Sequence, residues 1–512
     1  MGGRHCAHPT ARRCQRRRPY RGVIVSTHES ERIAFTPADE RGWSELTVVP
    51  DVVTPEVGGE VLARIVHVSD THICDAESTA RLEYLDRLSD PDSIYRLRFG
   101  EVGTYRPQEI LTVQVLAALV EAINAHADDL DAVVVTGDLI DNAQVNEKSW
   151  CAQVLNGGSI EPWSGDPLVS QWVGSREGHP WDERYWHPDG PSGATRPDIP
   201  TAQFGYPLIA GLVEAARRTV VSPGLNVPWL GVPGNHDALL QGTVAPDAEL
   251  RDLAVGDRRI VGLPPGRSPL LTLEGVAPIG PARYVHEADS PSIPAAPDPR
   301  RRLLSEDELS RPWIHDVGQV RFIAMDTVNH NGGWQGSLGS SQLQWLRQVL
   351  AESGGRYVVM LSHHPSWCLT NAHSHGEPRH LAAEIVHLLL DHPCVVAWLS
   401  GHVHAHASLW HGDDTSGFWE ITTASLIDWP QQARRLEIVR VDGRIGFRST
   451  VLDHAAPVDW SADDLADHRA LASISRVLAA NDYHDREGGI QRWREGRPDD
   501  RNTVWWTPDP YA

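Results

Sequence analysis

The sequence predicts an α/β protein. Between about residues 62 and 455, short apolar segments typical of buried strands alternate with segments whose apolar residues recur at helical spacing. Five of the predicted strands end directly in clusters of Asp, Asn and His. Because ligands of α/β sheets bind beyond the carboxyl ends of the strands, the same pattern predicts both the fold class and the position of a site.

The predicted elements follow from apolar periodicity, taken in chain order. The strands are short apolar runs bounded by polar or glycine residues, and we place them at 61–68, 131–136, 227–232, 320–325, 357–361, 395–399, 418–423, 435–441 and 445–451. The helices carry apolar residues three and four positions apart, and we place them at 107–126, 208–218, 341–350, 381–390 and 462–480.

Two long segments interrupt this alternation. Residues 143–206 are rich in Gly, Pro, Trp and Ser, and residues 238–317 are rich in Pro, Asp and Arg. Segments of this length inside a compact domain are usually functional caps or mobile insertions. We therefore predict a basic, disordered N-terminal arm (1–45), one domain with two insertions that form a cap (46–455), and a polar C-terminal tail with helical content (456–512).

The composition excludes several classes of protein. The chain has 46 basic and 68 acidic residues, for a formal net charge of -22, which makes nucleic acid and anionic membrane surfaces unlikely partners. No apolar run is long enough to span a bilayer, and the basic N-terminal cluster is not followed by the apolar run of a signal peptide. The six cysteines form no C-x-x-C pair, which favours reduced thiols and a cytoplasmic location.

The five clusters contain side chains that can bind metal ions. In chain order they are Asp70-Thr71-His72, Gly137-Asp138-Leu139-Ile140-Asp141, Gly234-Asn235-His236-Asp237, His363-His364-Pro365 and Gly401-His402-Val403-His404. Each cluster alone is a weak signal, because pairs of this kind arise by chance. All five at strand ends indicate one shared metal site.

The ligand types restrict the metal. Carboxylates, imidazoles and an amide oxygen suit Mn, Fe, Zn or Co, whereas the lack of thiolates disfavours soft metals. Side chains two residues apart on an extended segment point to one side, which would bring the Asp70 and His72 side chains together, and likewise His402 and His404. Two metals need a bridging carboxylate, and Asp138, at the end of a central strand, is the natural candidate.

The five clusters, in this order, resemble the signature of the calcineurin-like metallophosphoesterase superfamily: D-x-H, G-D-x-x-D, G-N-H-D/E, a His before x-Pro, and G-H-x-H. The resemblance covers about residues 62–425. The SDTHI opening, the HHP form of the fourth motif and the later SLIDWPQ stretch look closest to the bacterial cyclic-nucleotide and glycerophosphodiester phosphodiesterases. The fold that this resemblance implies is a four-layer α/β/β/α sandwich, with two mixed sheets flanked by helices.

The resemblance also implies a role for each residue. The implied ligands of two metal ions are Asp70, His72 and His404 for the first, Asn235, His363 and His402 for the second, and Asp138 as the bridge. His236 is implied to be the general acid or charge stabiliser over the phosphate, and Asp141 to orient it. The expected reaction is hydrolysis of a phosphodiester by a metal-bridging hydroxide, with a small-molecule phosphate ester as substrate.

Alternatives remain open at this point. A phosphomonoesterase would use the same dinuclear site, and a nuclease is supported only by the basic arm. A non-catalytic metal-binding scaffold is disfavoured because every ligand position is filled. The tryptophans of the first insertion, including Trp172 and Trp186, could stack on a substrate base, but packing of the insertion itself is the favoured interpretation.

Overall fold

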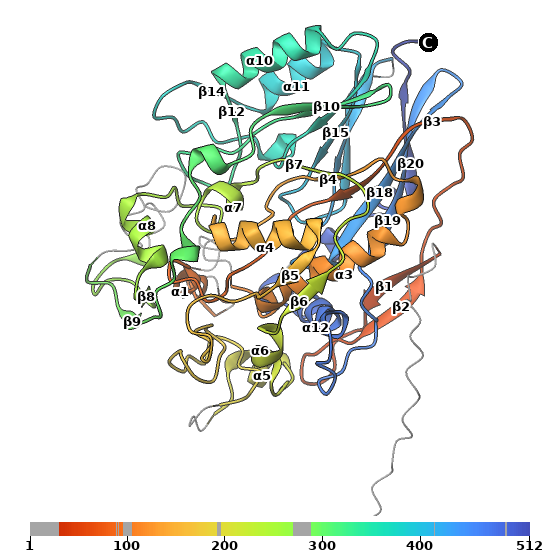
Figure 1. Cartoon of the computed structure of the whole chain (residues 1–512). Coiled ribbons are helices and arrows are strands. Elements are labelled where there is room, and N and C mark those ends of the chain that lie inside the picture. The colour runs from red at the N-terminus through yellow and green to blue at the C-terminus, as the bar shows by residue number, and fades with distance from the viewer. Residues whose placement is uncertain are drawn as a thin grey trace, which may run out of the picture.

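Two six-stranded sheets form the centre of the protein in this computed structural model (Figure 1). The structure describes residues 30–88, 90, 92–95, 105–191, 196–269, 288–413, 415–486 and 489–512. The predicted arm therefore lies outside the described residues up to residue 29.

The first sheet has the strand order β20-β19-β18-β3-β4-β7. Strands β3, β4 and β7 run parallel, whereas β18, β19 and β20 are antiparallel to their neighbours. The bounds of these strands are β3 Glu60–Val68, β4 Ala132–Val135, β7 Trp229–Gly231, β18 Gln432–Val441, β19 Arg444–Asp453 and β20 Thr503–Pro508.

The second sheet has the strand order β10-β11-β13-β15-β17-β16. Its four inner strands are parallel, and its two edge strands are antiparallel to their neighbours. The bounds are β10 Trp313–Val317, β11 Val320–Ala324, β13 Tyr357–Leu361, β15 Val395–Ser400, β16 Ala407–Gly412 and β17 Gly417–Thr422.

Strand alternation assigns the side chains of the central strands to different apolar clusters. On β4, Ala132 and Val134 belong to a cluster shared with the second sheet, whereas Val133 and Val135 pack with helices. On β13, Tyr357, Val359 and Leu361 belong to the same shared cluster. The two sheets therefore pack face to face.

Helices cover the other faces of the sheets. Residues of α3 (Thr112–Asn124), α4 (Val145–Asn156) and α12 (His468–Ala480) share a cluster with the first sheet, and residues of α10 (Ser340–Ala351) and α11 (Ala382–Leu390) share one with the second. Figure 1 accordingly shows α10 and α11 on the opposite side of the sheets from α3, α4 and α12. The predicted α/β class is confirmed.

The remaining elements are short. The helices are α1 Glu83–Asp86, α5 Ile199–Phe204, α6 Leu212–Ala216, α7 Asn235–Ala238, α8 Ala248–Val255, α13 Tyr483–Arg486 and α14 Ile490–Arg494. The 3₁₀ turns are η1 Glu109–Leu111, η2 Ala127–Asp129, η4 Pro299–Arg301, η5 Glu306–Glu308, η6 Ser366–Cys368 and η7 Pro498–Asp500. The described residues also form four two-stranded sheets: β1 Glu31–Phe35 with β2 Leu46–Pro50, β5 Gly158–Ile160 with β6 Val220–Ser222, β8 Arg258–Ile260 with β9 Ser292–Pro294, and β12 Leu338–Gly339 with β14 Arg379–His380.

The ends of the predicted domain and its first insertion differ from expectation. Strand β1 begins within the segment expected to be a disordered arm, and β20 lies within the expected tail. Helix α4 falls within the first predicted insertion, yet its Trp150 and Val154 are buried in the core beneath the first sheet. Weak apolar periodicity in these three segments explains why the sequence did not indicate their elements.

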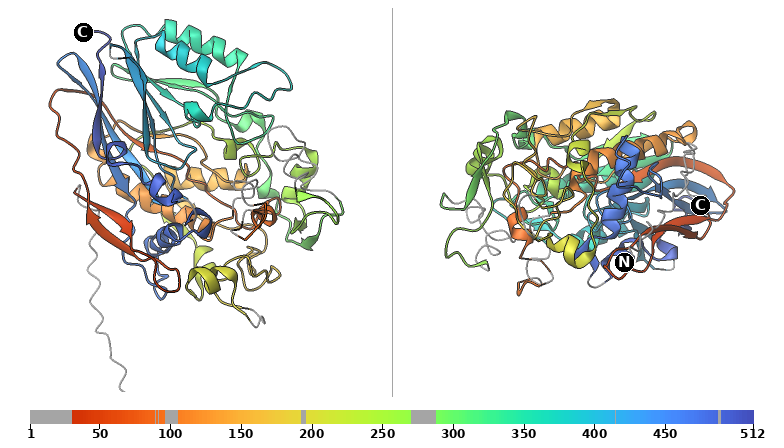
Figure 2. Two further views of the ribbon diagram at one scale, coloured as in Figure 1. Left: turned by 180° about the vertical axis from the view of Figure 1, so that it is seen from behind. Right: turned by 90° about the horizontal axis from the view of Figure 1, so that it is seen from below.

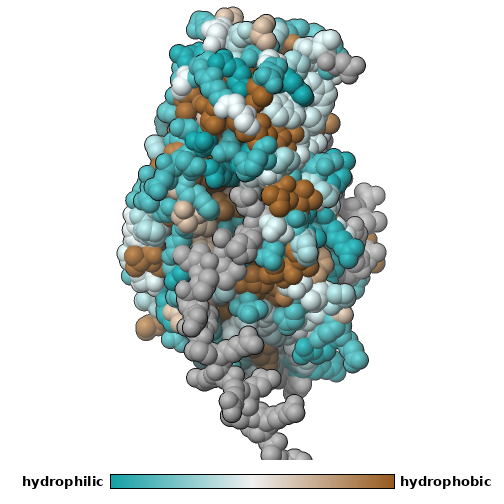
Figure 3. Space-filling model, turned by 90° about the vertical axis from the view of Figure 1, so that its right-hand side faces the viewer, coloured by the Kyte–Doolittle hydropathy of each residue, from teal (hydrophilic) through white to brown (hydrophobic). Residues whose placement is uncertain are grey.

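The second insertion lies far from the N-terminal hairpin. Figures 1 and 2 agree that α8, β8 and β9 are on the opposite side of the molecule from β1 and β2. The face turned to the viewer in Figure 3 is mostly hydrophilic, with separate hydrophobic patches. None of the helices in the described part of the chain is long and apolar enough to cross a membrane, and the four cysteines described there are free thiols.

The C-terminal strand should contribute to stability. Trp505 of β20 is 4% exposed, packs in the cluster between the sheets, and has the buried Arg434 guanidinium 5.3 Å from its ring centroid. Trp505→Ala should therefore lower the free energy of unfolding by roughly 3–5 kcal/mol in a urea titration. Trp493→Ala, at a position that is 52% exposed in the same segment, is the matched control, and an equal effect of both changes would contradict this role of β20.

Candidate metal centre

The five motif clusters meet at one edge of the two sheets. Strands β3, β4 and β7 carry the first three clusters at their carboxyl ends, and β13 and β15 carry the other two. Four sets of motif side chains place their donor atoms within 4.8 Å of one another and could each hold a metal ion: Asp70, His72 and His404; His72, Asp138 and His236; Asp70, Asp138 and His363; and His363, His364 and His402.

The backbone at these positions is unusual. Asp70, His72, Asp138, His402 and His404 all have positive φ values, between 42° and 68°. These residues follow the strand ends rather than continue them, so the expectation of two extended segments was wrong, although the side chains do converge. Backbone in this region is costly for residues other than glycine and concentrates at functional sites.

Two glycines allow the motif segments to approach each other. A Cβ atom at Gly234 would collide with the Asp138 carboxylate, and one at Gly401 would collide with Ser69 and the Asp70 carboxylate. Neither glycine is required by a positive φ. Close approach of backbone to side chain is therefore the reason for glycine at both positions.

The carboxylates of Asp70 and Asp138 lie at the centre. His404 Nε2 is 3.3 Å from Asp70 Oδ1, and His363 Nε2 is 3.1 Å from Asp138 Oδ2. Burial alone would raise the pKa of the Asp138 carboxyl, but His363 and His236 hold it well below its usual range. Burial lowers the pKa of His363 and His404, yet the facing carboxylates outweigh it and raise both to about 9.

In each of three histidines, Nδ1 lies at hydrogen-bond distance from an oxygen outside the centre of the site. His363 Nδ1 donates to the Thr136 carbonyl at 2.8 Å, His404 Nδ1 lies 2.6 Å from Asp428 Oδ2, and His72 Nδ1 lies 3.1 Å from Asp141 Oδ1. The opposite ring nitrogens turn toward the centre, where His72 Nε2 and His404 Nε2 are only 3.3 Å apart. Metal-binding histidines show this arrangement, because the outer partner fixes the tautomer and the ring orientation.

Asn235 gives an independent indication that the residues here fit a cation. Its side-chain Nδ2 donates to the Gly242 carbonyl at 3.1 Å, which fixes the amide, while its buried Oδ1 has no hydrogen-bond partner among the described residues. A buried carbonyl oxygen without a partner is costly unless something binds it. The oxygen and nitrogen donor set, without thiolates, fits the predicted class of metal ions.

His236 lies beside these groups. Its Nδ1 is 3.0 Å from the Asp141 carbonyl oxygen and 3.2 Å from Asp141 Oδ1. Its ring stands edge-on to His72 at a centroid distance of 4.5 Å. Burial lowers the pKa of His236, but Asp138 and Asp141 outweigh it and raise the pKa above its usual value, so the ring retains a proton more readily.

Two residues near the site were not predicted. Asp428 holds His404, and it lies in the SLIDWPQ stretch, which is a signal in the sequence for which no role was assigned. Arg81 contacts Asp141 and belongs to no motif. His364, in contrast, has Nδ1 at 2.8 Å from Thr327 Oγ1 and Nε2 at 2.9 Å from the Trp334 carbonyl oxygen. It therefore connects neighbouring loops through both ring nitrogens.

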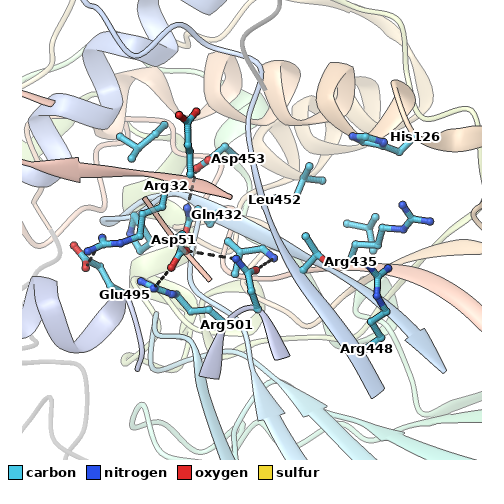
Figure 4. A pocket seen from close by; sticks show the side chains of 17 residues that line it. Arg32, Asp51, His126, Gln432, Arg435, Arg448, Leu452, Asp453, Glu495 and Arg501 are labelled. Carbon is cyan, nitrogen blue, oxygen red and sulfur yellow. Dashed lines mark hydrogen bonds and ion pairs between the residues drawn. The ribbon is translucent and has the colours of Figure 1, made fainter. Parts of the chain in front are cut away.

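A separate cavity of about 250 Å³ lies between the β1–β2 hairpin and strands β18 and β19 (Figure 4). None of the nine predicted site residues lines it. Its arginines are paired with acids, as Arg32 is with Glu495 and Arg501 is with Asp51. We therefore place no part of the reaction there.

Comparisons with known proteins point to a family of phosphoesterases. A model of the calcineurin-like phosphoesterase family matches residues 207–406, which contain the last three motif clusters. The chain is also 29% identical over 106 residues to the manganese-dependent ADP-ribose/CDP-alcohol diphosphatase of Xenopus laevis. That alignment covers 20% of this chain, and the chain spans 28% of the length of that relative.

Two solved structures are similar at a greater distance. A dimetal phosphatase from Danio rerio is 14% identical with a TM-score of 0.33, and the match covers 77% of this chain and 100% of that one. A purple acid phosphatase from yellow lupin is 14% identical with a TM-score of 0.29, covering 80% of this chain and 54% of that one.

The motifs and the family match together support the calcineurin-like phosphoesterase superfamily. Proteins of this class hydrolyse phosphate esters with metal ions, and the clustered carboxylates and imidazoles of this chain are compatible with metal binding. The finer resemblance to bacterial cyclic-nucleotide and glycerophosphodiester phosphodiesterases stays a prediction.

Proposed function

We propose that the protein is a two-metal phosphodiesterase acting on a small organic substrate. The observation that carries this proposal is the convergence of six Asp and His side chains in overlapping groups, with Asp138 shared between two of these groups and the Asn235 Oδ1 buried without a partner among the described residues. The assignment is Asp70, His72 and His404 for one metal, Asn235, His363 and His402 for the other, and Asp138 as the bridge. The cytoplasmic location indicated by the cysteines stays a prediction.

The chain's own residues account for the remaining chemistry. When bound, a pair of divalent cations supplies a nucleophile from water near neutral pH and neutralises charge on the phosphate. His236 Nδ1 lies at hydrogen-bond distance from Asp141. Its Nε2 is therefore the nitrogen that donates a proton to the leaving oxygen. Asp141 Oδ1 also holds His72, so one carboxylate orients both a metal ligand and the acid.

A second candidate is hydrolysis of a diphosphate bond in a nucleotide derivative. It is favoured by the similarity to the Xenopus protein named ADP-ribose/CDP-alcohol diphosphatase. A phosphomonoesterase would use the same set of side chains. A non-catalytic scaffold is disfavoured, because six of the seven expected ligands lie in overlapping groups and the seventh, Asn235, has a buried Oδ1 without a partner among the described residues.

Metal content tests the ligand assignment. Asn235→Ala should lose one of two metals, because Asn235 serves one group, whereas Asp138→Ala should lose both. His364→Gln is the matched control and should keep both, because protein groups already engage its ring nitrogens. The measurement is the metal-to-protein ratio after dialysis, and two metals retained in Asn235→Ala would contradict the assignment.

Leaving-group dependence tests His236. His236→Ala should keep both metals but slow the hydrolysis of esters with poor leaving groups by roughly 10²–10⁴-fold. The loss should be smaller for p-nitrophenyl esters, because that leaving group departs without a proton. His387→Ala, an exposed histidine of α11, is the control. Full activity of His236→Ala on a poor leaving group would remove it as the acid.

The rates of hydrolysis of a diester and a monoester test the proposed substrate class. With added Mn²⁺, the protein should hydrolyse bis(p-nitrophenyl) phosphate faster than p-nitrophenyl phosphate, and a chelator should abolish both activities. Cleavage of the monoester alone would contradict the diesterase proposal. Release of AMP from ADP-ribose, without cleavage of simple diesters, would favour the second candidate.

A further inference from the structure

Arg81 is a buried arginine whose side chain touches a carboxylate of the site. It is 1% exposed, and its Nη1 donates to Asp141 Oδ2 at 2.7 Å. A buried guanidinium is costly unless several acceptors engage it. The contact between Arg81 and Asp141 is therefore a fixed ion pair rather than a flexible surface contact.

The second oxygen of the same carboxylate faces the two histidines. Asp141 Oδ1 lies 3.1 Å from His72 Nδ1 and 3.2 Å from His236 Nδ1. Because Arg81 holds Oδ2, it fixes the rotation of the carboxylate and with it the position of Oδ1. Arg81 therefore contacts His236 indirectly, through the Asp141 carboxylate.

The rest of the guanidinium is held by two more buried carboxylates. Nε donates to Glu83 Oε1 at 2.6 Å, and Nη2 donates to Glu109 Oε2 at 2.6 Å. Glu83 is the first residue of α1, and Glu109 is the first residue of η1, directly before α3. The planar fork of arginine can engage three carboxylates at once, which the ammonium of lysine cannot reproduce.

Each insertion contributes a side chain that donates a hydrogen bond to one of these two glutamates. The indole Nε1 of Trp172, from the first insertion, donates to Glu109 Oε1 at 2.7 Å. Arg259, on β8 of the second insertion, donates to Glu83 and also to the Gln171 carbonyl of the first insertion. A continuous chain of buried contacts therefore runs from each insertion through Arg81 to Asp141.

We propose that Arg81 is a positioning residue that sets the orientation of His236 through Asp141 and links it to the contacts that Trp172 and Arg259 of the two insertions make with Glu109 and Glu83. This inference rests on the proposed function. A displacement of about 1 Å at a reacting group can cost roughly 10²-fold in rate, so a shift of the Asp141 carboxylate is sufficient to matter. Proton donation to the leaving oxygen is the step that responds.

The protein offers matched controls for this network. Arg301 is also fully buried and joins the two insertions through Ser164 Oγ and the Ala296 carbonyl, and the contacts described for it do not include Asp141. Trp186 is a buried tryptophan of the first insertion whose indole donates to the Pro207 carbonyl. Changes at these residues perturb the insertions without removing a described link to Arg81.

The test compares two esters that differ in leaving group, methyl p-nitrophenyl phosphate and methyl phenyl phosphate, at equal metal content. Arg81→Met should lower kcat on the phenyl ester by roughly 10²-fold, with a much smaller loss on the p-nitrophenyl ester. Arg81→Lys and Trp172→Phe should shift the ratio of the two rates in the same direction by less. Arg301→Met and Trp186→Phe should leave the ratio unchanged.

A double variant separates positioning from general destabilisation. In a His236→Ala background, Arg81→Lys should have no further effect on the ratio, because the group that it positions is absent. An additive effect, or an equal loss on both esters in Arg81→Lys and Trp172→Phe, would overturn the proposal. If Arg81→Met does not fold, the unchanged or changed ratio in Trp172→Phe decides.

The outcome also distinguishes this inference from the proposed function. If the wild-type protein with Mn²⁺ cleaves neither diester nor the matching aryl monoesters, the proposed function fails and the inference fails with it. If the wild type is active and the ratio stays constant across the Arg81 and Trp172 variants, only the inference fails. If only monoesters are cleaved, p-nitrophenyl phosphate and phenyl phosphate form the pair.

Discussion

The negative charge of Asp138, buried at the edge of two sheets, is the constraint on which the site depends. The carboxylate is 1% exposed, yet it keeps its charge because His363 lies 3.1 Å from one oxygen and the His236 backbone N–H donates to the other at 2.8 Å. A buried charge needs such partners, since desolvation would otherwise neutralise it. The surrounding strand ends supply these partners, and cations would complete them.

Orientation of the rings follows from the same need. The histidines can direct one nitrogen to the centre because the other is engaged by Thr136, Asp428 or Asp141. Asp428 is in turn held by Arg106 and by Arg494 of the C-terminal segment. The segment expected to be a tail therefore contributes to holding His404, a proposed metal ligand, and the network around the site extends well beyond the five motifs.

Much of the fold and of the central site could be predicted from the sequence, because both depend on patterns among residues that are close together in the chain. Apolar runs mark buried strands such as β13, whose predicted bounds agree with Tyr357–Leu361, and the motif residues follow those runs directly. Strands β1 and β20 have too little apolar periodicity to be distinguished from loops. Arg81 could not be predicted, because a single charged residue in a loop has no local signature and acquires its role only through contacts made by distant segments.

The free-energy cost of burying the charged side chains around Arg81 indicates what this network is for. Five charged side chains (Arg81, Arg259, Glu83, Glu109 and Asp141) lie buried together, although well-packed apolar residues in such a place are often equally or more stabilising. Stability alone therefore does not account for this choice of residues. What apolar residues could not do is hold the Asp141 carboxylate by one oxygen while the other oxygen faces His72 and His236. We infer that geometric control of this carboxylate is the reason for a charged network between the insertions and the metal centre.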